Sequence, residues 1–163
     1  MPSNGEKQNI LVITQFYFPS TEIDYKIKEK IENMASQGNN ISVIATKDAS
    51  DSFSEIENVK FHFIDQEKFK GGSEWAYVYH NIIFLWKSIR LGLGLKENFD
   101  LVEAVLPTGF AGITAKIIAG NKKTKYSIDE KENWIENALN KNYLIKNSPF
   151  HKAAVFIDNW LKK

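Results

Sequence analysis

The segment from Asn9 to Thr46 constrains the fold more than any other part of the sequence. It holds two short apolar runs, Ile10 to Thr14 and Ile41 to Thr46, separated by a helical pattern that ends at Gly38. Neither run alternates with polar residues, which is typical of parallel strands covered on both faces. The segment therefore predicts a β-α-β unit. The loop from Gln15 to Asp24 is then expected at the carboxyl edge of the sheet, where ligands bind in such folds.

Length and composition are those of an ordinary globular domain. The 163 residues suffice for one domain with a sizeable core, and 43% of them are hydrophobic and 25% charged. The formal net charge of +1 points to neither nucleic acid nor a membrane as a partner. The chain has no cysteine, so disulfides and thiolate metal ligands are absent. The polar first residues lack the apolar stretch of a secretory signal, and we expect a cytoplasmic protein.

The rest of the sequence continues the alternation of strands and helices. Further strands are predicted at Val59 to Asp65, Phe99 to Pro107 and Lys123 to Asp129. Helices are predicted at Ile23 to Gln37, Trp75 to Leu95, Thr108 to Gly120, Glu130 to Leu139 and Asn147 to Lys163. Parallel neighbours need helical crossovers, so the expected fold is α/β. We expect a Rossmann-like, doubly wound, mostly parallel sheet with helices on both faces, formed by residues 1–163 as one domain.

The helix expected from Trp75 to Leu95 has a broad apolar face, made by Tyr79, Ile82, Ile83, Trp86, Ile89 and Leu93. The simpler interpretation is a crossover helix that packs this face on the sheet. The second is an interfacial helix, because aromatic side chains with Lys87 and Arg90 suit a membrane surface or a lipid-linked substrate.

Several kinds of chemistry lack their motifs in this sequence. No G-x-G-x-x-G turn, phosphate-binding loop, G-x-S-x-G or H-E-x-x-H element is present, so nucleotide cofactors, hydrolysis and zinc have no support. His62, His80 and His151 lie on different predicted elements, and no metal site is predicted. His62 is either a ligand or base, or a partly exposed structural residue, which is the commoner role of a lone strand histidine.

Polar residues gather where the predicted strands end. They are Gln15 to Glu22, Lys47 and Asp48, Asp65, Leu106 to Gly109, and Asp129 to Glu132. In a parallel sheet these ends share one edge, although caps and turns of any α/β domain would place similar residues there. Thr108 and Gly109 open a helix and can offer backbone N–H groups to an anion.

Three stretches resemble a known family. ILVITQFYFPS with the following helix and ISVIATK resembles the opening of retaining glycosyltransferases of family 4, which have the GT-B fold. FDLVEAVLPTGFAGITAKIIAG resembles a later strand and small-residue helix of that family, and KTKYSIDEKENWIENAL the segment carrying its Asp-Leu-Trp-Pro-Glu element. The resemblance covers nearly the whole chain as the N-terminal, acceptor-binding half. The donor-binding half, with its Glu-x₇-Glu element, is not among these residues.

The chain departs from the family pattern at ligand-facing positions. Ser20-Thr21-Glu22 replaces the glycines of the first loop, and Glu103-Ala104-Val105 stands where a histidine is often found. Only Asp129 and a displaced Trp134 remain of the Asp-Leu-Trp-Pro-Glu element.

The resemblance implies an acceptor-binding domain of a nucleotide-sugar-dependent glycosyltransferase that works in glycan or polysaccharide synthesis. The acceptor, a sugar or lipid-linked saccharide, would meet a cleft formed by Pro19, Ser20, Thr21, Pro107, Thr108, Gly109 and Asp129. No catalytic residue is assigned, and no cofactor is expected on this chain. The nucleotide-sugar donor would bind a missing domain, in the same or a second chain, so the isolated chain is expected to be inactive. Peripheral contact with the inner face of the membrane fits such an acceptor.

The alternative is a non-catalytic module that keeps the fold and binds a glycan, a lipid or a protein. Its contact surface would be the helix Trp75 to Leu95 or the exposed end of the sheet. A flavodoxin-like or receiver domain is a weaker option, since the first strand lacks the acidic pair of receivers and the first loop lacks a Ser/Thr-rich phosphate-binding run.

Overall fold

The computed structural model describes residues 7–16, 22–47, 55–67, 69–106, 108–130 and 133–163. Within these ranges the chain forms one parallel sheet in the order β3-β2-β1-β4-β5. The strands are β1 (Asn9–Phe16), β2 (Asn40–Lys47), β3 (Val59–Asp65), β4 (Leu101–Leu106) and β5 (Lys125–Glu130). The helices are α1 (Glu22–Ser36), α2 (Glu74–Gly94), α3 (Gly109–Lys122), α4 (Trp134–Asn140) and α5 (Pro149–Leu161).

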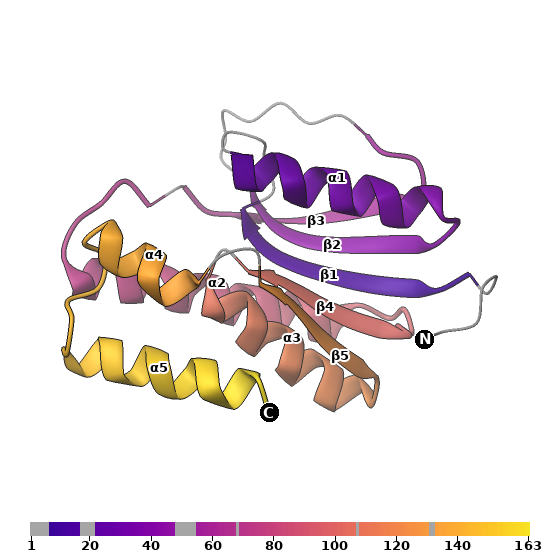
Figure 1. Cartoon of the computed structure of the whole chain (residues 1–163). Helices are drawn as coiled ribbons and strands as arrows, with labels where there is room; N and C mark the ends of the chain where they lie inside the picture. The colour runs from indigo at the N-terminus through magenta and orange to yellow at the C-terminus, as the bar shows by residue number, and fades with distance from the viewer. Residues whose placement is uncertain (1–6, 17–21, 48–54, 68, 107, 131–132) are drawn as a thin grey trace.

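The helices lie on both faces of this sheet, as Figure 1 shows. Helix α1 covers one face, and α2 and α3 cover the other, with α4 and α5 on the same side as α3. The connection from β1 to β2 and the connection from β4 to β5 run in opposite directions across the sheet. Because parallel crossovers are right-handed, opposite directions place α1 and α3 on opposite faces. The prediction of a Rossmann-like, doubly wound α/β fold is confirmed.

The apolar runs of the central strands supply two cores at once. Leu11 and Ile13 of β1 belong to the core beneath α2 and α3, whereas Val12 between them belongs to the core beneath α1. All three side chains are fully buried. Successive side chains of a strand point to opposite faces, so a strand covered on both faces must be apolar throughout.

Helix α2 packs on the sheet with a different face from the one expected. Its buried residues are Tyr77, Asn81, Phe84, Ser88 and Gly92. Tyr79, Ile82, Trp86 and Leu93, which the simpler interpretation of the sequence placed against the sheet, are exposed. That interpretation is wrong, because α3 packs closely on the side of α2 that carries Ser88 and Gly92. The hydroxyls of Ser88 and Thr114 are 2.8 Å apart across this contact.

We expect Gly92→Ala to lower the free energy of unfolding by about 1–3 kcal/mol, through overpacking. A Cβ atom at Gly92 would stand 2.2 Å from Cδ1 of Ile118 and 3.3 Å from Cδ1 of Ile44. Both isoleucines are almost fully buried and have little room to move.

Gly94→Ala, two residues further on the same helix, is the matched control. Nothing lies within 4 Å of its Cβ position, so the change should be within about 1 kcal/mol of neutral. Urea unfolding of both variants measures the difference, and equal losses would mean that the contact with α3 is not tight.

Candidate functional site

The order of the strands places a topological switch point between β1 and β4. These strands are neighbours, and the chain leaves them toward opposite edges of the sheet. Open α/β sheets bind their ligands at the carboxyl edge beside such a point. Gln15 of β1 and Thr108, which follows β4, lie at this edge.

Gln15 carries an amide group that is only half satisfied. Its side chain is fully buried, and its Oε1 atom accepts a hydrogen bond from Oγ1 of Thr108. Among the residues that the structure describes, its Nε2 atom has no partner. Turning the amide around would exchange the two atoms and still leave one of them unpaired. A buried polar atom without a partner costs about 1–3 kcal/mol, so this group calls for an explanation.

Thr108 and Gly109 stand at the start of α3, as the sequence predicted. The hydroxyl of Thr108 and the absence of a side chain at Gly109 both serve the local packing. Thr108 is the N-cap residue, yet its hydroxyl accepts no capping bond, and it donates to Gln15 instead. The expected side-chain cap is therefore absent. A Cβ atom at Gly109 would come within 2.5 Å of the ring of Trp134, which is itself buried. Glycine at this position lets α4 pack against the start of α3.

Asp129 belongs to a separate group of charges on the face that α1 covers. Nζ of Lys30, from α1, lies 2.6 Å from Oδ2 of Asp129 and 3.0 Å from Oε1 of Glu103. Ser127 donates to the same oxygen of Glu103 at 3.2 Å. These ionic side chains are 13–24% exposed, so the network ties α1 to β4 and β5 in a partly dry setting.

The seven residues selected from the sequence therefore fall into three groups. Thr108 and Gly109 lie together at the switch point, and Asp129 joins the Lys30 network. Pro19, Ser20, Thr21 and Pro107 lie outside the described residues. Gln15 was not among the predicted site residues, although it began the expected loop. Glu103 carried a recognisable signal, since it is a charged residue inside an otherwise apolar strand.

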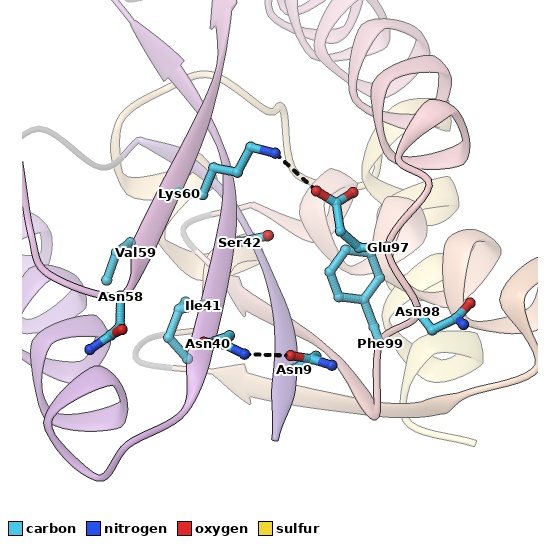
Figure 2. A pocket seen from close by; sticks show the side chains of 10 residues that line it. All are labelled: Asn9, Asn40, Ile41, Ser42, Asn58, Val59, Lys60, Glu97, Asn98 and Phe99. Carbon is cyan, nitrogen blue, oxygen red and sulfur yellow. Dashed lines mark hydrogen bonds and ion pairs between the residues drawn. The ribbon is translucent and has the colours of Figure 1, made fainter. Parts of the chain in front are cut away.

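A hollow with a volume of about 630 Å³ lies at the opposite, amino edge of the sheet. Figure 2 shows its lining residues, which come from β1, β2, β3 and the segment before β4. Polar groups here already pair with one another. Lys60 and Glu97 form an ion pair at 2.9 Å, and Asn40 donates to Asn9 at 2.8 Å. The hydrogen bond from Lys60 lowers the pKa of Glu97. We therefore favour the switch point as the candidate site, because a hydrogen-bond donor there, Nε2 of Gln15, has no partner among the described residues.

His62 lies in β3, and the side chains of its two neighbours along the strand point to the opposite face of the sheet. Burial, and then the charge of Lys60, lowers its pKa, and its Nε2 atom has no partner. Burial also lowers the pKa of His80 on α2. Among the described residues, no group of three or more histidines and carboxylates is placed to hold a metal ion. Within the same part of the chain, no helix is long and apolar enough to cross a membrane.

We expect Lys30→Met to lower the free energy of unfolding by about 1–3 kcal/mol, because it leaves two partly buried carboxylates beside each other. Lys28→Met is the matched control on the same helix. It breaks a pair with Glu32 whose side chains are 35% and 40% exposed, and such pairs contribute about 0.5 kcal/mol. Chemical denaturation at neutral pH compares the two variants. Similar losses in both would show that the network has no special role.

The comparisons with known proteins establish the fold alone. No family model matches the sequence, and no curated protein matches it. Among solved structures, the chain is similar to the C-terminal domain of a hydrogenase from Pyrococcus furiosus, with a TM-score of 0.54 and 15% sequence identity. The match covers 79% of this chain and 97% of that domain. At this identity the likeness concerns the α/β architecture, and it agrees with the sheet described above.

Proposed function

We propose that this chain is the acceptor-binding domain of a nucleotide-sugar-dependent glycosyltransferase, with the acceptor at the switch point between β1 and β4. The observation that carries the proposal is the unpaired amide nitrogen of Gln15, buried at the edge where such folds bind ligands. The resemblance of three stretches of the sequence to family 4 glycosyltransferases gives the class of ligand.

The chemistry of the site favours a neutral ligand rich in hydroxyl groups. Gln15 and Thr108 are both uncharged, and Nε2 of Gln15 needs an oxygen that accepts a hydrogen bond. The nearest acidic candidate from the sequence, Asp129, is already paired with Lys30. A saccharide hydroxyl can accept from the amide and donate elsewhere, and it adds no charge to a buried position.

Sugar transfer would require more than these residues. A retaining transfer holds donor and acceptor together in one geometry, and much of the rate comes from that positioning. We expect the purified 163-residue chain to show no transfer from nucleotide-sugars to added saccharides. Chromatography measures the nucleotide that is released in such an assay. Release above the blank would contradict this expectation.

The binding test uses Gln15→Leu, which removes the unpaired amide and keeps a similar volume. We expect the free energy of unfolding to change by less than about 2 kcal/mol, because the loss of the unsatisfied amide is offset by the loss of the acceptor for the buried hydroxyl of Thr108. We expect it to lose the amide shifts that mono- and disaccharides induce at Gln15, Thr108 and Gly109 in two-dimensional NMR spectra.

Lys60→Gln, at the amino-edge hollow, is the control and should keep those shifts. Retention of the shifts in Gln15→Leu would refute the assigned site. Shifts confined to Ser42 and Lys60 would place the ligand at the amino edge instead.

The alternative, a non-catalytic binding module, is favoured by a different observation. Helix α2 exposes large apolar side chains that no described part of the chain covers. For this candidate, neither saccharides nor nucleotide-sugars would perturb the switch point, and a partner would perturb α2 alone.

A further inference from the structure

Helix α2 carries large apolar side chains on its solvent side as well as on its buried side. Trp75, Tyr79, Ile82, Trp86 and Leu93, here called the α2 stripe, are 40–71% exposed. Their spacing places them within about 60° of one another around the helix axis and over about 27 Å of its length. The buried side consists of Tyr77, Asn81, Phe84, Ser88 and Gly92. The solvent side therefore departs from the usual amphipathic pattern, in which the side away from the core is polar.

The stripe continues into an apolar groove between α2, α3 and α5. Ile82 belongs to both, and the groove is lined further by Phe110, Phe150 and Ile157. At the start of α2 the rings of Trp75 and Phe150 meet edge to face, with centroids 4.5 Å apart. An apolar surface therefore extends from α2 toward α5.

The charged residues of α2 are one acid and two bases, and Nζ of one base, Lys87, donates to the backbone carbonyl of Asp65 at 2.8 Å. Glu74 is the single acidic residue of α2, and its Oε1 atom accepts from the hydroxyl of Ser148 and the backbone of Ile145. Lys87 and Arg90 are the basic residues of α2, and the guanidinium of Arg90 lies 5.6 Å from the ring centre of Trp86. A line of tryptophan, tyrosine and aliphatic side chains flanked by basic groups matches the interface of a bilayer that contains anionic lipid.

We propose that the α2 stripe is a membrane-binding surface, on which α2 lies parallel to an anionic bilayer with its aromatic side chains at the level of the headgroups. Trp and Tyr combine an apolar ring with a polar N–H or O–H group, which suits this depth. Arg90 lies beside Trp86 and can reach lipid phosphates. The inference does not depend on saccharide binding at the carboxyl edge, because the vesicles that test it carry no sugar.

Co-sedimentation with lipid vesicles tests the proposal. We expect the chain to bind vesicles of phosphatidylcholine with phosphatidylglycerol, and to bind phosphatidylcholine alone more weakly. Added salt should weaken the first interaction. The double variant Trp75→Ser, Trp86→Ser should lower partitioning about tenfold or more, because it removes two large rings from the buried area.

Tyr25→Ser is the matched control, since Tyr25 is 61% exposed but lies on α1, across the sheet. It should bind as the parent does. Arg90→Gln should weaken binding to the anionic vesicles only. A parent chain that stays in the supernatant, or equal losses in Tyr25→Ser and the double variant, would overturn the proposal.

Fluorescence quenching by brominated lipids gives a second measurement that needs no substitution. Trp75 and Trp86 are 71% and 61% exposed, whereas Trp134 is 3% exposed, and Trp160 on α5 is 39% exposed and contributes to the same signal. We expect quenching of the exposed tryptophans on vesicle binding. Absence of quenching would overturn the proposal, as would a self-association that depends on the α2 stripe and competes with vesicles, since a second copy would then cover it.

Discussion

The exclusion of water from both faces of β1 is the constraint on which the rest of this structure depends. Its consecutive residues Leu11, Val12 and Ile13 are fully buried and serve the two cores in turn. Burial continues through Thr14 and Gln15, so the polar end of the strand is as dry as its middle. In such a place each polar atom needs a partner, and the half-paired amide of Gln15 becomes the most informative group in the site.

The sequence was sufficient for the architecture because strands and helices leave local signals. Continuous apolar runs and the alternation of elements predicted a doubly wound sheet, and the described residues have that fold. The site depends on contacts between distant residues. The pairing of Lys30 with Asp129 joins positions 99 residues apart, and Thr108 reaches Gln15 over 93 residues. Position along the chain predicted that Thr108 and Gly109 lie at the carboxyl edge of the sheet, but no local pattern shows which hydrogen-bonding atoms remain unpaired.

Helix α2 shows a second limit of sequence patterns. Large apolar side chains at helical spacing predict an apolar face. From the sequence of the helix alone, this face would be expected to pack against the sheet. The approach of α3 decided otherwise, since the hydroxyl contact between Ser88 and Thr114 and the small volume of Gly92 allow the two helices to pack closely. A helix with two apolar sides can bury only one of them against its own domain. The choice rests on the neighbouring helix, which the periodicity of α2 does not encode.

The two proposed surfaces meet at the apolar groove. Gly109 and Trp134, beside the switch point, line one part of it, and Ile82 of the α2 stripe lines another. The groove has a volume of about 200 Å³ and an almost wholly apolar lining. If both proposals hold, a lipid-linked acceptor lying in the membrane would present its sugar to Gln15 and Thr108 while its hydrocarbon part follows the groove. The arrangement would then explain why the helix that starts at the carboxyl edge of the sheet carries an aromatic stripe, and why the groove beside it has an almost wholly apolar lining.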